Sequence, residues 1–125
     1  FQYKEFEKKF YMNKKDLKII DQYNHIIGLH SHSQFHRIGK LDVKTQLKEY
    51  KKNINLLSDI LNKPNNYFNS MSHPNGSYSS KTLTILNNLG LKLGFKQIMT
   101  IEKDKGMKKI NNSPLEIARK PHNEF

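Results

Sequence analysis

The chain has 125 residues, which is enough for one small domain with a core and too few for two. No apolar run reaches the roughly 18 residues of a membrane span, no signal peptide is recognisable, and the absence of cysteine excludes disulfides and thiolate metal sites. The net charge of +11 suits an anionic glycan, a nucleic acid or a membrane surface, although lysines scattered along helices explain it equally well.

Two helices with a short strand between them are predicted in the first half of the chain. Residues 13–16 cap a helix that runs to about residue 23, and an apolar run of strand length follows at 25–29. Asp42 is the expected N-cap of the longest helix, which ends before Pro64. The inward positions of these two helices are expected at Leu17, Ile20, Tyr23, Leu47, Tyr50, Ile54, Leu57 and Leu61.

The second half is predicted to alternate strand, turn, helix and strand. A strand over 67–71 opens into the Pro/Asn/Gly turn at 72–78, and Ser79 or Ser80 then caps a helix. A further strand is expected within 91–96, followed by a polar tail. The inward positions of the helix are expected at Leu83, Leu86 and Leu89.

This alternation predicts the fold class as α/β, with parallel strands and helices packed outside them. In such folds the functional loops follow the carboxyl ends of the strands. Two conspicuous polar stretches, the histidine-rich loop at 30–36 and the turn at 72–78, both occupy that position. Their shared placement indicates a functional site.

The histidine-rich loop carries three of the six histidines of the chain, His30, His32 and His36. Neutral imidazole is the commonest protein ligand for zinc, and two histidines four residues apart, such as His32 and His36, can converge on one ion. The alternative is a solvent-exposed loop without a metal. The spacing alone leaves both interpretations open.

The turn at 72–78 is less specific by itself. Pro74 and Gly76 favour a tight turn, and a glycine allows the backbone to approach a ligand closely. Backbone N–H groups in such a turn can donate to an oxyanion. A plain connection between a strand and a helix is an equally good explanation of these residues.

Taken together, the two stretches resemble the polysaccharide deacetylase family, whose core is the NodB homology domain. Ile27–Ser31 fits the opening of the family's His-Ser/Thr-x-x-His motif, and Ser72–Tyr78 fits a variant of its Arg-x-Pro-Tyr-Gly motif. The helix and strand after that turn, and the late "SPLEIARKPH" segment, are similar to further family segments. The resemblance implies that residues 1–125 form a single, partial domain of a distorted (β/α) barrel. Because the chain starts with Phe and lacks the family's Thr-Phe-Asp-Asp motif, we expect sequence upstream of it.

The resemblance also implies roles for individual residues. A divalent metal, with zinc expected, is held by His30, while Gln34 stands at the second ligand position, where His32 or His36 is the replacement. The backbone N–H of Asn75 is the implied oxyanion donor, and His122 is a candidate acid. The residues implied to contact substrate are Ser72, His73, Pro74, Gly76 and Tyr78.

The implied function is metal-dependent hydrolysis of an acetyl group on an N-acetylated amino-sugar polysaccharide, that is, of a carbon–nitrogen bond other than a peptide bond. Without the family's Asp-Asp pair, this chain alone can be an inactive fragment. The alternatives are a non-catalytic remnant that binds an anionic glycan and, less favoured, a basic nucleic-acid-binding domain, for which no motif is recognisable. The expected location is cytoplasmic or at the cell envelope. Exposed sheet edges favour self-association into a homo-oligomer.

Overall fold

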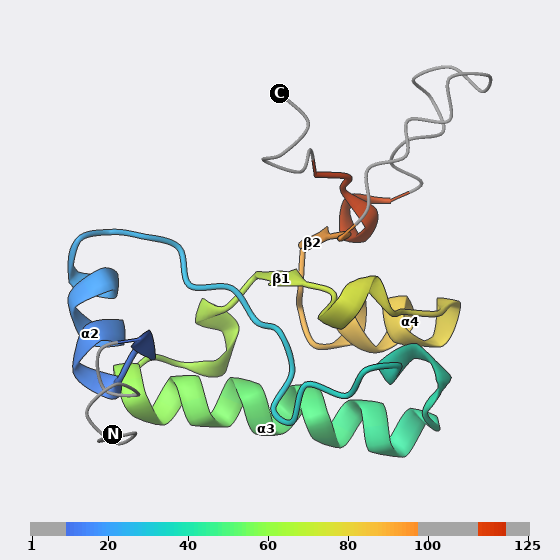
Figure 1. Cartoon of the computed structure of the whole chain (residues 1–125), viewed down its shortest axis with the longest axis horizontal. Coiled ribbons are helices and arrows are strands. Elements are labelled where there is room, and N and C mark those ends of the chain that lie inside the picture. Colours follow the sequence, from blue (N-terminus) through green and yellow to red (C-terminus); the bar gives the residue numbers. More distant parts are fainter. Residues whose placement is uncertain (1–9, 98–112, 120–125) are drawn as a thin grey trace, which may run out of the picture.

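The computed structural model describes residues 10–97 and 113–119. In this part of the chain, two helices come first and are followed by a strand, a third helix and a second strand parallel to the first (Figure 1). The helices are α2 (Lys14–Gln22), α3 (Val43–Leu61) and α4 (Ser80–Asn88), and the strands are β1 (Ser70–Ser72) and β2 (Leu93–Phe95). Short 3-10 helices lie at Ile38–Lys40, Asn65–Tyr67, Pro74–Gly76 and Pro114–Glu116. No helix in the described ranges combines the length and the apolarity that crossing a membrane requires.

The helices begin where the capping residues predict. At α2, the side chain of Asn13 accepts from the backbone N–H groups of Lys15 and Asp16. In return, the side chain of Asp16 accepts from the backbone N–H of Asn13 at 2.8 Å. Asp42 caps α3 by accepting the N–H of Thr45 at 2.9 Å. Local chemistry of this kind is set within four residues, so the sequence predicts these boundaries well.

Three predicted inward positions of the helices differ in the structure. Tyr23, expected on the inner face, is 76% exposed, because α2 ends at Gln22 and Tyr23 is only its C-cap. In helix α4, Leu86 is fully buried, whereas Leu83 and Leu89 are only partly buried and pack against the edge of the core. The inward stripe of this short helix is therefore narrower than the leucine spacing predicts.

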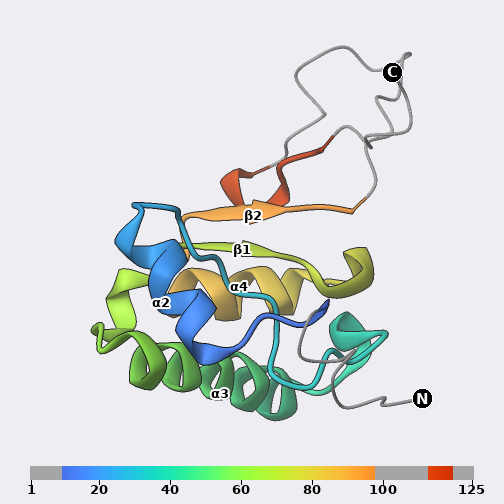
Figure 2. The ribbon, with the colours of Figure 1, turned by 60° about the vertical axis from the view of Figure 1, so that its left-hand side comes forward.

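The strands are shorter than predicted but lie in parallel, as expected. β1 and β2 pair with Met71 opposite Gly94, and Figure 2 shows them side by side with α4 and then α3 below them. Leu29 adds a parallel bridge to Met71, and Ile117 adds one to Phe95. Four chain segments thus run in the same direction, although only single residues of the outer two are bridged. The predicted strands at 25–29 and 67–71 are correspondingly reduced, the latter because Asn65–Tyr67 coils into a 3-10 helix.

The sheet has a buried face and an open face. Leu29 and Met71 point into the core, where they join side chains of the helices such as Tyr50 and Leu86. The residues that alternate with them line a groove of about 500 Å³ on the other face, together with neighbouring backbone; they are Gly28, His30, Ser70, Ser72, Leu93 and Phe95. His30, at the carboxyl end of its segment, therefore belongs to the groove.

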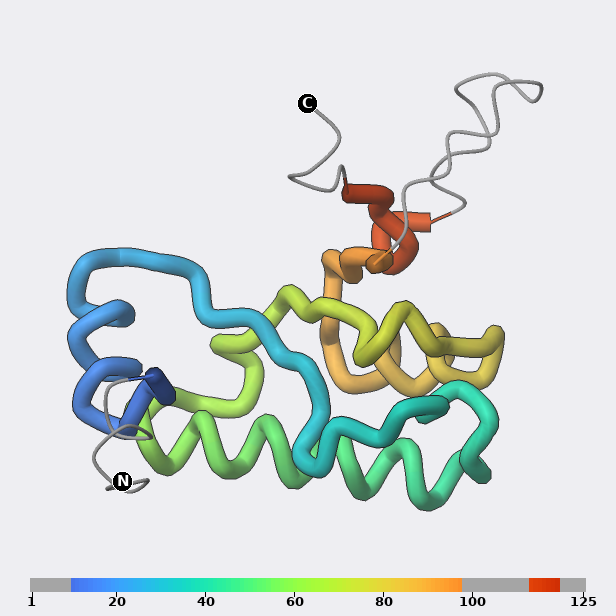
Figure 3. Tube along the Cα trace, viewed as in Figure 1, coloured from blue at the N-terminus to red at the C-terminus, as the bar shows by residue number. Residues whose placement is uncertain are grey.

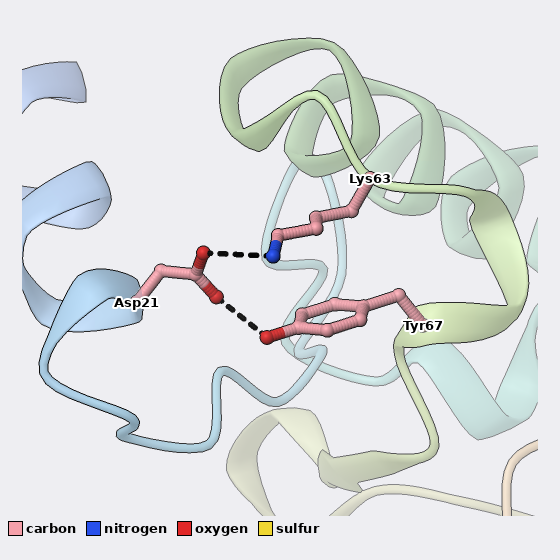
Figure 4. Close-up of polar contacts among 3 residues, drawn as sticks. All are labelled: Asp21, Lys63 and Tyr67. Atoms are coloured by element: carbon pink, nitrogen blue, oxygen red, sulfur yellow. Dashed lines mark hydrogen bonds and ion pairs between the residues drawn. The ribbon is translucent and has the colours of Figure 1, made fainter.

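Two polar clusters connect the helices to the rest of the fold. Gln46 of α3 and Thr82 of α4 are both fully buried, and the Thr82 hydroxyl donates to Gln46 Oε1 at 2.6 Å. On the periphery, Asp21 of α2 accepts from the Tyr67 hydroxyl at 2.6 Å and pairs with Lys63 at 3.4 Å (Figure 4). The second cluster fastens α2 to the connection between α3 and β1.

Candidate active site

His30 is held in one orientation by two hydrogen bonds. Its backbone N–H donates to Asn53 Oδ1 of α3 at 3.0 Å, and its ring Nδ1 lies 2.8 Å from the carbonyl oxygen of Ser72. Because a carbonyl oxygen can only accept, Nδ1 carries the hydrogen, and in the neutral ring Nε2 is left with a free lone pair. Histidines that ligate metals typically have one ring nitrogen fixed in this way.

The rest of the histidine-rich loop is folded against α3, which the chain crosses before it enters that helix (Figure 3). The buried carboxylate of Glu49 accepts from Ser33 twice, from the backbone N–H at 2.8 Å and from the hydroxyl at 3.2 Å. Gln34 takes a left-handed conformation with φ of 48°. The side chains of His32 and His36 are exposed. Within the described ranges, no three His, Cys, Asp or Glu side chains gather closely enough to hold a metal ion.

The turn after β1 is a single turn of 3-10 helix with an unusual backbone. Gly76 N–H donates to the carbonyl of His73 at 3.0 Å, and Ser77 N–H donates to that of Pro74 at 2.8 Å. Asn75 and Gly76 both have left-handed φ values, 50° and 65°, which asparagine and glycine tolerate better than other residues. No acceptor for the N–H of Asn75 is found among the described residues, so this donor is available to a ligand.

The histidine-rich loop and the turn are in direct contact. Besides the His30–Ser72 hydrogen bond, Gly39 N–H donates to the Ser77 hydroxyl at 3.1 Å. Gly39 also lies so close to the backbone of Tyr78 that an added Cβ would be 2.6 Å from the Tyr78 carbonyl carbon. The structure thus brings together the two stretches that the sequence analysis singled out.

His73, predicted to contact substrate, is 1% exposed in this structure. Its Nε2 donates to the carbonyl of Leu115 at 2.7 Å, its buried Nδ1 has no partner among the residues that the structure describes, and its ring stacks on Tyr78. Pro74 is buried as well, whereas Ser72, Gly76 and Tyr78 are partly exposed. His122 lies outside the described residues.

The buried imidazole of His73 predicts a pH-dependent stability. Burial lowers its pKa below the ordinary 6.5; the Leu115 carbonyl and Glu116 oppose this effect, and electrostatic interactions with the nearby His30 and Lys96 add to it. The unfolded chain therefore binds a proton more readily, and the free energy of unfolding should fall as the pH drops from about 6.5 towards the lowered pKa of the folded state. Urea titrations between about pH 7.5 and 5 measure this slope. A His73→Gln variant should show a smaller slope, and an unchanged slope would contradict the assignment.

Three residues of this region were not identified from the sequence: Glu49, Asn53 and Glu116. Glu49 and Asn53 recur at helical spacing with Gln46 on the inner side of α3. Polar residues on the inward stripe of an otherwise apolar face are a signal that could have identified them.

The fold and the site together define an α/β protein with its candidate site at the carboxyl ends of parallel strands. The polysaccharide deacetylase family model matches residues 5–94. The chain therefore belongs to the polysaccharide deacetylase family. Among curated proteins, none matches the sequence.

Two solved structures share the fold. The Streptococcus pyogenes deacetylase PplD in complex with acetate matches 86% of this chain with a TM-score of 0.67 and 20% identity. The deacetylase domain of BpsB from Bordetella bronchiseptica matches 88% with a TM-score of 0.67 and 14% identity. The chain covers 43% and 48% of these two chains, respectively, which is less than half of each.

Proposed function

We propose that this chain is a deacetylase-like domain that acts on N-acetylated amino-sugar polysaccharide. The observation that carries the proposal is the hydrogen bond from His30 Nδ1 to the carbonyl of Ser72, at 2.8 Å. It joins the candidate metal ligand to the strand end that leads, three residues later, to the free N–H of Asn75. A metal ligand and an oxyanion donor on adjoining loops are two of the groups that metal-assisted acetyl hydrolysis requires.

We propose that the site takes a divalent metal, zinc in particular, with His30 as the one oriented ligand among the described residues. His30 would hold the ion through Nε2, and His32 or His36 would replace the imidazole that Gln34 does not provide. When bound, such an ion would polarise the acetyl carbonyl and make a water molecule more acidic. His30 itself is pre-oriented for this role, since its ring cannot turn without losing the bond to Ser72.

The turn would stabilise the negative charge that develops on the carbonyl oxygen. The N–H groups of Gly76 and Ser77 are used inside the turn, which leaves that of Asn75 as the donor. Because this N–H is fixed before substrate binds, little reorganisation is needed when the charge forms. The adjacent groove has apolar surface at Leu93 and Phe95 for the acetyl methyl group.

We also propose that the described segments are one part of a distorted (β/α) barrel, as a single partial domain over 1–125. The two solved deacetylases are matched over less than half of their length. The carboxylates that complete the metal site, including the general base, would then lie outside the described residues.

Zinc binding to the full chain tests the proposal directly. Calorimetric titration should show that His30→Ala weakens zinc binding by at least about tenfold, the usual effect of losing a ligand or its support. His25→Ala is the matched control, since His25 is an exposed histidine outside the loop. The zinc affinity of this variant should stay within about twofold of that of the wild type. Acetate release from N-acetylglucosamine oligomers, followed with and without zinc, tests the reaction. Equal zinc binding by both variants would overturn the role of His30.

A non-catalytic glycan-binding domain is the second candidate. It is favoured by the net charge of +11 and by the lack of a three-ligand group within the described ranges. It requires saturable binding of an anionic polysaccharide that persists after chelation of metals, without release of acetate. Loss of all glycan binding with the chelator would exclude it.

A further inference from the structure

We propose that Tyr78 and Glu116 are a pair of positioning residues that holds the turn at 72–78 in its donor conformation. This inference rests on the proposed function, because it concerns the turn that presents Asn75. It assigns Tyr78 a role other than contact with substrate, and it gives a role to Glu116, which lies near the far end of the described chain.

Both oxygens of the Glu116 carboxylate accept a hydrogen bond, one of them from Tyr78. The Tyr78 hydroxyl donates to Glu116 Oε1 at 2.9 Å, and the Ser113 hydroxyl donates to Glu116 Oε2 at 3.0 Å. Burial and the neighbouring carboxylate raise the pKa of Tyr78 to about 12, so its hydroxyl keeps its proton at neutral pH. Because the carboxylate is fixed by Ser113, it can fix the tyrosine in turn.

The turn is held on both of its sides by neighbouring residues of the same segment. Near the start of the turn His73 donates to the carbonyl of Leu115 at 2.7 Å, and at its end Tyr78 donates to Glu116. The two rings also stack on each other, with centroids 4.4 Å apart. The segment is itself fastened to the sheet, since Ile117 N–H donates to the carbonyl of Gly94 at 2.7 Å. The turn is thus positioned relative to the strands.

External restraint matters because the turn has one position in a less common backbone conformation. Asn75 at φ 50° lies in the left-handed region, which asparagine tolerates better than most residues but adopts less readily than glycine, so its surroundings help to keep it there. His73 and Tyr78 are the residues that flank the strained positions. Holding the two flanks keeps the N–H of Asn75 in place, and releasing one flank should let the turn relax.

Amide NMR of the full chain tests this with a closely matched control. Tyr78→Phe and Glu116→Gln should each shift the Asn75 and Gly76 amide signals and speed their hydrogen exchange. Tyr67→Phe removes an equivalent hydroxyl-to-carboxylate bond, that to Asp21 at 2.6 Å, and should leave both signals unchanged. The double variant at positions 78 and 116 should shift them no further than either single variant. If Tyr78→Phe moves the signals no more than Tyr67→Phe does, the inference is wrong.

Titration with acetate separates this inference from the function it rests on. If the wild type shows a saturable acetate-induced shift of the Asn75 amide, Tyr78→Phe should weaken it by about three- to tenfold, the loss expected for one hydrogen bond. If the wild type shows no such shift, the role of Asn75 as an anion donor fails, while the amide comparison still decides whether the pair holds the turn.

Discussion

The Gly94→Ala substitution is expected to lower the free energy of unfolding by about 3 kcal/mol, because overpacking and lost hydrogen bonds act together at this position. A Cβ at residue 94 would meet the backbone of Leu115, with its carbonyl carbon at 2.9 Å. Backbone cannot move aside as a flexible side chain can. The segment would have to leave β2, and the hydrogen bonds from Ile117 to Gly94 and from Lys96 to Ile117 would be lost. Urea titration gives the change in free energy.

Gly28→Ala is the control for this steric effect. Gly28 also faces a neighbouring strand, but an added Cβ there would lie 3.1 Å from the Ser70 hydroxyl oxygen, which can rotate, and 3.3 Å from the Ser70 carbonyl oxygen, a milder overlap than at Gly94. We expect a loss below about 1 kcal/mol there. Comparable losses in the two variants would show that the close approach of Leu115 to Gly94 is not what limits substitution.

Gln46→Ala is expected to lower the free energy of unfolding by about 3 kcal/mol, although it replaces a polar residue and removes no apolar side chain from the core. Gln46 is fully buried; its Oε1 accepts from Thr82, and its Nε2 donates to the carbonyl of Leu41 at 2.7 Å. Alanine would leave a space between α3 and α4 and remove partners of two polar groups. Each buried group without its partner costs about 1–3 kcal/mol. Thermal and urea unfolding should both show the loss.

The same substitution at an exposed helical position provides the reference. Gln22 lies at the end of α2 and is exposed, so Gln22→Ala should change the free energy of unfolding by less than about 0.5 kcal/mol. If Gln46→Ala were as mild, the buried amide would not be what joins α3 to α4.

The helices could be predicted from the sequence and the strands only in part, for a physical reason. Caps such as Asp42 act on backbone groups within three residues, so the start of a helix can be predicted from a few neighbouring residues. A strand forms only where its backbone pairs with another strand. Within the apolar run at 25–29, Leu29 is the residue that bridges to a strand among the described segments. The apolar pattern therefore predicts the place of each strand better than its length.

At the candidate site, the position of the two loops was predictable and their supports were not. Parallel strands bring their carboxyl ends together, and the contact of His30 with Ser72 follows from that rule. Glu49 and Glu116 support the two stretches, Glu49 from a segment distant in sequence to Ser33 and Glu116 from one distant to Tyr78, and nothing in the residues next to them indicates which donors they will meet. Their contribution becomes visible only when α3 and the segment 113–119 are seen packed in place.

Two hydrogen bonds to the turn at 72–78 have a consequence for protein engineering: one comes from His30 of the histidine-rich loop to Ser72, the other from Gly39 in the 3-10 helix after that loop to Ser77. If one of these stretches alone were replaced by that of a related family member, the other would lose its hydrogen-bond partner, because the donors and the acceptors come from different stretches. The transferable module is the pair of loops, together with the glycine at position 39 that lets their backbones touch.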